Sequence, residues 1–219
     1  MKKVLKPIAS AAIAVLAVTS FSCSKEESNK KDDNNKNNET SLEFKHDGHS
    51  YLIVKELKTW AEAAKDAAER GGYLVEIGSL AEQEAVYKGI RNAGISTTYT
   101  KVNDGGGIAY VWIGAMATAE RAWIWNGANK TGQHPVFWIG NKDGSAIAGS
   151  YVNWGGKSAG KFNEPDDYTH PTYAPNGQNV AAIGLQSWPA GSSIQLGIAG
   201  EWNDIANSNK LYYVVEFDK

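Results

Sequence analysis

Cysteine is nearly absent from this sequence, whose 219 residues include only Cys23. A single cysteine cannot form a disulfide within the chain, and it cannot supply the several thiolates of a structural zinc site. The four histidines do not make up for this, because none has a metal-ligand spacing such as His-x-x-x-His. We therefore expect a domain that is held together by packing, without disulfides and without zinc.

Long apolar runs and basic clusters are also missing. The longest apolar stretch, residues 8–18, is too short to cross a membrane as a helix, and Lys2, Lys3 and Lys6 precede it. This order is typical of a signal peptide. Its removal would take these three lysines away and change the formal net charge from −2 to −5. No basic stripe follows in the rest of the chain, so we do not expect a nucleic acid partner.

The apolar stretch leads into Ser20-Phe21-Ser22-Cys23, which resembles a bacterial lipobox, with Ser20 where leucine is usual. The resemblance implies that residues 1–22 are a lipoprotein signal peptide and that the thiol of Cys23 is lipidated after cleavage. The protein would then contact the membrane through its lipid anchor only. The alternative is a free thiol left over in an ordinary secretory signal.

A polar tether is expected after the anchor, over residues 23–41. Residues 24–41 contain no apolar side chain, so they cannot bury enough surface to offset their ordering entropy. The sequence Ser24-Lys25-Glu26-Glu27 resembles the surface-export signal of Bacteroidetes lipoproteins. This resemblance implies a lipid-anchored protein exposed on the outer face of the outer membrane. The alternative is a simple run of solvated charges.

Residues 42–219 are enough for one domain with a sizeable core. Thr59 with Glu62 and Ser79 with Glu82 have the spacing of two capping boxes. Apolar residues follow each box at helical spacing, which predicts one helix that ends at Gly71-Gly72 and a second that ends near Gly94. The residues expected on their buried faces are Trp60, Ala63, Ala64, Ala67 and Ala68 in the first helix and Leu80, Val86 and Ile90 in the second.

Short apolar runs separated by turn residues predict the strands of the domain. They cover residues 42–44, 51–54, 73–77, 110–113, 123–125, 137–139, 180–183 and 211–217. Long loops are expected at 140–150 and 167–179, and loops of this length usually carry function or mobility. The tryptophans expected in the core are Trp60, Trp112, Trp125, Trp154 and Trp202.

The order of these features resembles the C-type lectin-like domain, over essentially all of residues 42–219. After the two capped helices come Trp112-Ile113-Gly114, Trp123-Ile124-Trp125-Asn126-Gly127, Asn153-Trp154, Glu164-Pro165-Asp166 and Trp202-Asn203-Asp204. The resemblance implies an α+β fold in which two helices flank two small antiparallel sheets, with a long loop region that carries the ligand site. The disulfide cysteines of the family are replaced here near Ala67 or Ala68 and at Val180, Asn207 and Val215.

Two of these motifs place hard oxygen ligands on separate segments, an arrangement that suits calcium. In the family, the corresponding residues bind calcium and hydrogen-bond vicinal sugar hydroxyls. Carried over by position, the resemblance implies a calcium site made of Glu164, Asp166, Gln178, Asn203 and Asp204, where Gln178 replaces an acid. The alternative is that these residues only cap turns.

The loops between the motifs also contain aromatic residues that could stack on a sugar. Trp188 is expected as an exposed platform, with Tyr168 and Tyr173 as further candidates. We do not expect an enzyme, because nothing around Glu164 or Asp204 indicates a raised pKa. The sequence therefore favours a surface lipoprotein that binds glycans through calcium. The alternative is an adhesin or assembly subunit that binds protein on the same fold without calcium.

Overall fold

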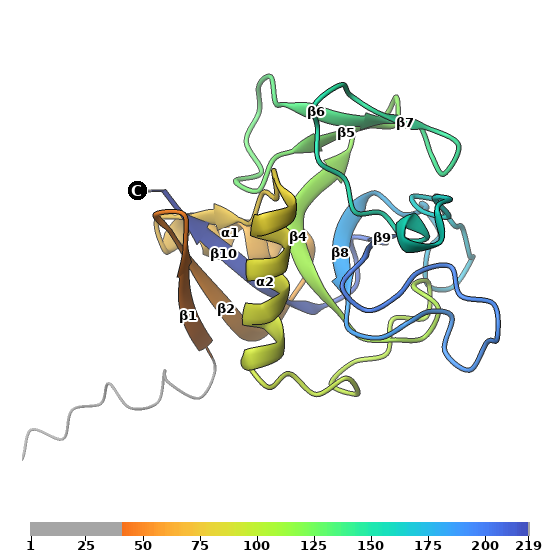
Figure 1. Ribbon diagram of the computed structural model, residues 1–219, viewed down its shortest axis with the longest axis horizontal. Coiled ribbons are helices and arrows are strands. Elements are labelled where there is room, and N and C mark those ends of the chain that lie inside the picture. The colour runs from red at the N-terminus through yellow and green to blue at the C-terminus, as the bar shows by residue number, and fades with distance from the viewer. Residues whose placement is uncertain (1–40, 219) are drawn as a thin grey trace, which may run out of the picture. The chain divides into compact units, whose positions relative to one another are not determined.

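The first two strands and the last strand of the domain lie side by side. The computed structural model describes residues 41–218, in which β1 (Ser41–His46) and β2 (His49–Lys58) form an antiparallel hairpin. The hairpin turns at Asp47 and Gly48, which both have positive φ, as the Asp-Gly pair predicts. Along its other edge β2 pairs with β10 (Leu211–Phe217), so both ends of the described chain belong to one part of the sheet (Figure 1).

The membrane-related predictions fall almost entirely outside this range. The predicted signal peptide over residues 1–22, Cys23 and the tether as far as residue 40 lie outside the described residues. Ser41, which the sequence assigns to the tether, is the first residue of β1. Within residues 41–218, no helix combines the length and the apolar character that crossing a bilayer requires.

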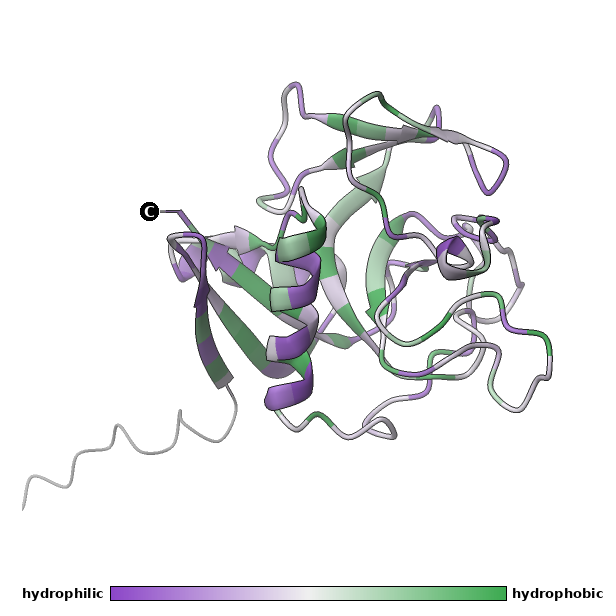
Figure 2. Ribbon diagram, in the orientation of Figure 1, coloured by the Kyte–Doolittle hydropathy of each residue, from purple (hydrophilic) through white to green (hydrophobic). Residues whose placement is uncertain are grey.

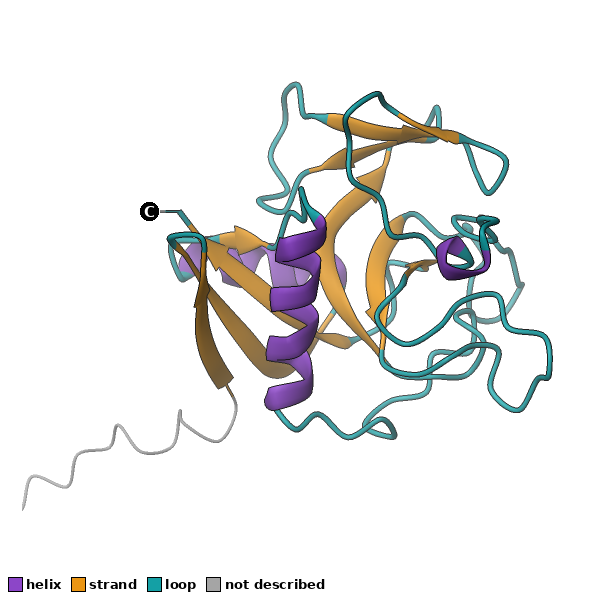
Figure 3. Cartoon of the chain, in the orientation of Figure 1, coloured by secondary structure: helices purple, strands orange, loops and turns teal. Residues whose placement is uncertain are grey.

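Both predicted helices are present, as α1 (Trp60–Glu69) and α2 (Leu80–Asn92) (Figure 3). The capping box of α1 is complete, because Thr59 Oγ1 accepts from Glu62 N and Glu62 Oε2 accepts from Thr59 N at 2.9 Å. At α2 only half of the box forms. Ser79 Oγ accepts from Glu82 N, but the Glu82 carboxylate accepts from Gly78 N and from the hydroxyl of Tyr51 instead.

The buried faces of the helices differ from the prediction at two positions. Trp60, Ala63, Ala64 and Ala67 are buried as expected, whereas Ala68 is exposed. In α2, Val86 and Ile90 are buried, but Leu80 is 58% exposed. The polar Gln83 is on the buried face because both ends of its carboxamide have partners. Its Nε2 donates to Gly200 O, and its Oε1 accepts from the indole of Trp202. A prediction based only on apolar residues therefore includes Leu80 and omits Gln83 from the buried face of α2.

All ten strands within residues 41–218 belong to one sheet, in which β4 occupies the centre. β4 pairs with β5 and β8 in antiparallel fashion and with β10 in parallel. The α+β class with two helices is thus as expected, but the antiparallel ladders are joined through the parallel pair of β4 and β10 instead of forming two sheets. The remaining bounds are β3 (Tyr73–Leu74), β4 (Tyr110–Ala117), β5 (Ala122–Trp125), β6 (Val136–Ile139), β7 (Ser145–Ala146), β8 (Val180–Gly184) and β9 (Trp202–Ile205).

Three strands depart from the prediction. The segment predicted over residues 73–77 forms a ladder only at β3, since Glu76 N donates to the side-chain carboxylate of Glu216 in β10 and not to a backbone carbonyl. β7 falls inside the predicted loop 140–150, and the Trp202-Asn203-Asp204 motif is itself a strand, β9, paired with β8. The motif therefore has a fixed backbone, and its side chains are positioned by the sheet.

Aromatic packing takes the place of disulfides in the core. All five tryptophans predicted to be in the core are buried, and Trp202 contacts the rings of Trp125, Trp154, Phe137 and Tyr151 edge to face. Figure 2 shows apolar residues along β2, β4 and β8 and hydrophilic residues along the outer face of α2. The end of the domain beyond β8 and β9 consists mostly of loops, and these loops carry the site (Figure 3).

Candidate functional site

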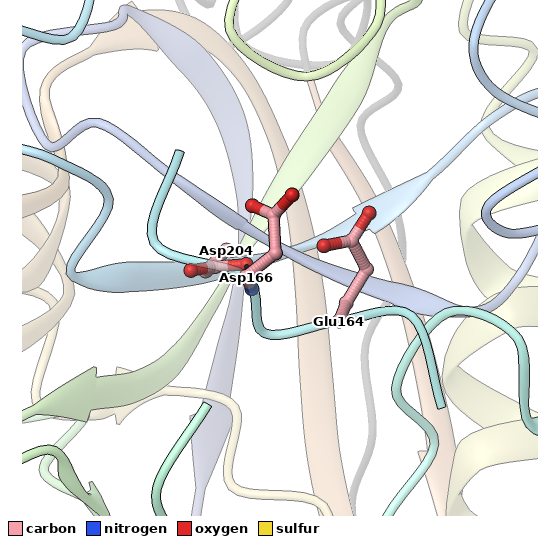
Figure 4. A group of neighbouring side chains, drawn as sticks. All are labelled: Glu164, Asp166 and Asp204. Carbon is pink, nitrogen blue, oxygen red and sulfur yellow. Dashed lines mark hydrogen bonds between the residues drawn. The ribbon is translucent and has the colours of Figure 1, made fainter. Parts of the chain in front are cut away.

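Three carboxylates from two distant segments meet at the loop-rich end of the domain. Glu164 and Asp166 lie in the loop after η2 (Lys157–Ala159), and Asp204 lies in β9. One oxygen from each lies within 4.8 Å of the others (Figure 4). The predicted convergence of the Glu164-Pro165-Asp166 and Trp202-Asn203-Asp204 motifs is therefore confirmed. The peptide bond between Glu164 and Pro165 is cis.

Asp204 holds the loop in place by accepting hydrogen bonds from its backbone. Its Oδ1 accepts from Asp166 N at 3.0 Å, and its Oδ2 accepts from Asp167 N at 2.9 Å. Asp166 continues the pattern, because its Oδ1 accepts from Tyr168 N at 3.0 Å. Since β9 is fixed by the sheet, these bonds set the position of Asp166 relative to Asp204.

A fourth acidic side chain, Glu201, anchors the segment that leads to Glu164. Its Oε2 accepts from the amides of Gly156 and Ile198, and its Oε1 accepts from the amide and the hydroxyl of Ser158. This buried carboxylate is fully hydrogen-bonded within the protein, and it needs no further ligand. Glu201 thus shows how this fold satisfies a buried carboxylate, with hydrogen bonds to both of its oxygens.

Glu164 is buried without such compensation. Only 2% of it is exposed, its Oε1 accepts from the indole of Trp188 at 2.9 Å, and its Oε2 is buried with no hydrogen-bond partner among the described residues. Burial raises the pKa of Glu164 well above its usual range, and the charges of Asp204 and Asp166 raise it further. The expectation that nothing raises the pKa of this residue is wrong, because the sequence did not reveal its burial.

The other two carboxyl groups are shifted in the same direction. Burial, followed by the charge of Asp166, raises the pKa of Asp204 to about 7, although two backbone N–H groups stabilise its ionised form. Burial also raises the pKa of Asp166. A cluster of this kind holds its negative charge at a cost, and a cation bound to it would lower that cost.

These shifts predict how the stability of the metal-free domain depends on pH. Because the folded-state pKa values exceed those of the unfolded chain, the folded protein binds more protons between about pH 4 and 7. The free energy of unfolding should therefore rise by about 1–3 kcal/mol as the pH falls from about 8 to 5. Urea denaturation in metal-free buffer measures this.

Glu76 and Glu216 lie outside the cluster and must be controlled for in that experiment, because burial raises the pKa of Glu76 as well. Burial also raises the pKa of Glu216 to about 7, so Glu216 contributes to the pH dependence with the same sign. The Glu216→Gln variant should keep the part of the rise that comes from the cluster. A metal-free domain of this variant that loses stability between pH 8 and 5 would contradict the prediction.

Trp188 is not the exposed platform that the sequence suggested. It is 1% exposed, and its ring packs edge to face against Tyr110 beneath the loop. Its role is to donate a hydrogen bond to Glu164 and to line the floor of the site. Tyr168, by contrast, is 42% exposed, and Tyr173 is half-buried and stacks on His170 at 3.6 Å between ring centroids. Only Tyr168 thus offers an open aromatic face beside the site.

Gln178 and Asn203 are buried and bonded to the protein. Gln178 Oε1 accepts from Tyr168 N at 2.8 Å, and its Nε2 donates to Asp104 O at 2.9 Å. Both ends of this carboxamide hold the loop, so the prediction that Gln178 is a metal ligand is not supported by its geometry. Asn203 Nδ2 donates to the hydroxyl of Tyr110 at 2.9 Å, and Asn203 also lines the cavity of the site.

The cavity beside the carboxylates has a volume of about 220 Å³ and is lined by both polar and apolar residues. The lining includes the polar side chains of Glu164, Asp166 and Asn203 and the apolar side chains of Trp188, Pro189 and Leu196. Tyr168 also lines this cavity. Such a site combines ligands for a hard cation with an apolar surface, which suits a small hydroxylated ligand.

Two charged residues that the motifs do not include contribute to this region. Asp104 Oδ2 accepts from Ala206 N and its Oδ1 accepts from Asn209 Nδ2, so it ties the segment before β4 to the end of β9. Arg121 Nη2 lies 3.4 Å from Asp204 Oδ2. Both lie in turns, and no spacing in the sequence indicates that they belong to the site.

Comparisons with known proteins find no family model and no curated protein that matches this chain. Solved structures do match. The chain is similar to the human scavenger receptor C-type lectin carbohydrate-recognition domain, with 18% identity, 81% of this chain and 96% of that chain covered, and a TM-score of 0.49. The corresponding mouse domain is 20% identical, with 81% of this chain and 94% of that chain covered and a TM-score of 0.47. The C-type lectin CEL-I from Cucumaria echinata is 20% identical, with 80% of this chain and 93% of that chain covered and a TM-score of 0.46. At these identities the likeness concerns the fold alone.

Proposed function

We propose that residues 42–219 form a carbohydrate-binding domain that holds a calcium ion with Glu164, Asp166 and Asp204. The observation that carries this proposal is the buried Oε2 of Glu164, which has no partner among the described residues and lies in a group of three carboxylates. An unpaired buried carboxylate costs several kcal/mol, and a divalent cation relieves that cost. Calcium fits because carboxylate oxygens are its preferred ligands.

Sugar is the proposed ligand because of the motifs and the shape of the site. The order of motifs resembles the C-type lectin-like domain, and the cavity is lined by both polar and apolar residues. When bound, the calcium ion would supply coordination positions for sugar hydroxyls. Glu164, Asp166 and Asn203 line the cavity, where they could hydrogen-bond those hydroxyls, and the exposed ring of Tyr168 could pack against the C–H face of a sugar.

Thermal melting in calcium and in chelator tests the metal. With an affinity on the order of 10⁻⁴–10⁻³ M, as in extracellular modules, about 10 mM Ca²⁺ should stabilise the fold by about 1.4–2.7 kcal/mol. For a domain of this size, the melting temperature should rise by about 3–10 °C. An equal shift with Mg²⁺ would point to non-specific charge screening. A glycan array, run with calcium and with chelator, then tests the ligand.

The second candidate function is calcium-independent binding of a protein partner. Two observations favour it: Arg121 already contacts Asp204, and Ile194 and Ile198 are exposed in the loop beside the cavity. Exposed apolar residues of this kind can contribute to a protein interface. Melting that is insensitive to calcium, together with a glycan array without hits, would favour this candidate over the first.

The raised pKa of Glu164 makes one further assay necessary. A carboxyl with a raised pKa next to a second carboxyl is also found in glycoside hydrolases. Any glycan that binds should therefore be incubated with the protein and followed for hydrolysis. Turnover that disappears in a Glu164→Gln variant would replace the binding proposal with a catalytic one.

Anchoring at the cell surface is part of the same proposal. Lipidation of Cys23 and the polar segment that follows would hold the domain at the outer membrane and expose it to glycans outside the cell. The Cys23→Ser variant should then be released into the soluble fraction of cells that express the full chain. Recovery of the wild-type chain in the soluble fraction would contradict the lipid anchor.

A further inference from the structure

Arg121 is a cation that the fold places against the acidic site. It lies in the turn between β4 and β5 with a φ of 61°. Its side chain is 21% exposed, and its guanidinium lies over the ring of Trp123 at 5.3 Å from the ring centroid. Stacking on an aromatic ring restricts a long side chain to one orientation, so the charge of Arg121 is directed at a fixed place.

Its guanidinium contacts three separate segments of the chain. Nη2 lies 3.4 Å from Asp204 Oδ2 in β9, and Nη1 donates to Gln178 O at 2.8 Å. Nη1 also lies 3.4 Å from Asp167 Oδ1, and Nε donates to Asn141 Oδ1 at 2.8 Å. A planar fork with five N–H donors can satisfy such a set at once, which a lysine cannot do.

These contacts close the base of the long loop that follows Asp166. Asp167 and Gln178 are the two ends of this loop, and Asp167 Oδ1 also accepts from Gln178 N at 3.1 Å. Asp167 N in turn donates to Asp204 Oδ2. Arg121 therefore contacts both ends of the loop and the carboxylate of β9 that orients it.

We propose that Arg121 is a positioning residue, a built-in cation that keeps the base of the loop 167–178 closed without any metal. It neutralises part of the charge of Asp204 and Asp167 on one side, and it leaves Glu164 and Asp166 to face the cavity on the other. The calcium ion would then enter a site whose loop is already in place, which lowers the entropic cost of binding. Only this last step rests on the proposed function.

Hydrogen exchange of the full domain, followed by mass spectrometry on peptides that cover residues 164–180, tests the role of Arg121. In chelator the wild-type amides of Asp166, Asp167 and Gln178 should be protected. In Arg121→Gln they should exchange at least about tenfold faster, since bonds to a charged partner are lost. Arg121→Lys should lie between the two, because it keeps the charge but not the fork. The control is Arg91→Gln, which removes another arginine that stacks on a ring, that of Tyr87.

Calcium provides the readout that a general structural defect would not give. About 10 mM Ca²⁺ should restore most of the protection in Arg121→Gln, because the ion would again bring the loop and Asp204 together. Equal exchange of wild type and Arg121→Gln in chelator would overturn the proposal, as would an unprotected loop in the wild type. If calcium does not shift the melting of the wild type, the calcium site fails, but the comparison in chelator still decides the role of Arg121.

Discussion

Replacement of Trp202 by alanine is expected to destabilise the domain by about 3–5 kcal/mol, the range for a large buried aromatic side chain. Trp202 is fully buried, and it contacts four other aromatic rings in the core. Its indole also donates to the carboxamide of Gln83 at 2.7 Å, which ties α2 to β9. The substitution would leave both a cavity and an unpaired buried oxygen, and urea denaturation at equilibrium measures the combined loss.

Two further variants separate these contributions. Trp202→Phe keeps most of the ring but removes the donor to Gln83, so it should cost about 1–3 kcal/mol. Leu80→Ala changes an exposed side chain of α2, the helix that contains Gln83, and should change stability by less than about 0.5 kcal/mol. If Trp202→Ala were as stable as Leu80→Ala, the aromatic cluster would not be what replaces the disulfides of the fold.

The sequence predicts those parts of the fold that depend on local or repeated patterns. The capping box at Thr59 and the alanines after it predict α1, because the hydrogen bonds involved join residues three or four apart. The five tryptophans predicted to be in the core are buried, since so large an apolar surface is rarely left exposed. The parallel pairing of β4 with β10 is different. It joins residues about a hundred positions apart, and no local pattern encodes it.

For the site, the sequence predicts the meeting of charges but not their partners. The two motifs converge as expected, and the backbone amides of Asp166 and Asp167 donate to the Asp204 carboxylate where they meet. The sequence places Trp188 and Gln178 in polar loops, and for that reason it does not reveal that both side chains are buried. The indole of Trp188 donates to Glu164, and the carboxamide of Gln178 donates to the backbone carbonyl of Asp104. Arg121 was missed because its partners are scattered along the chain. Polar contacts of this kind become visible only in three dimensions.

The Glu164→Gln variant is expected to be more stable than the wild type in chelator and insensitive to calcium. Glutamine has the shape of glutamate and keeps an oxygen that can accept from the indole of Trp188. It removes the buried charge, and its amide can donate toward the oxygens of Asp166 or Asp204 in the same cluster. At pH 8 in chelator, the free energy of unfolding should therefore rise by about 1–3 kcal/mol.

In calcium the stability advantage of Glu164→Gln over the wild type should shrink or disappear. The wild type gains stability from the ion, whereas Glu164→Gln lacks one of three carboxylates and should bind calcium roughly 100-fold more weakly, in line with the loss of a charged ligand. The matched control is Glu216→Gln, a change of another buried glutamate with a raised pKa, which pairs with His49 outside the site. This control should alter stability but keep the calcium shift. A Glu164→Gln variant that is destabilised in chelator and still stabilised by calcium would mean that Glu164 is not a ligand, and that its buried charge is tolerated for another reason.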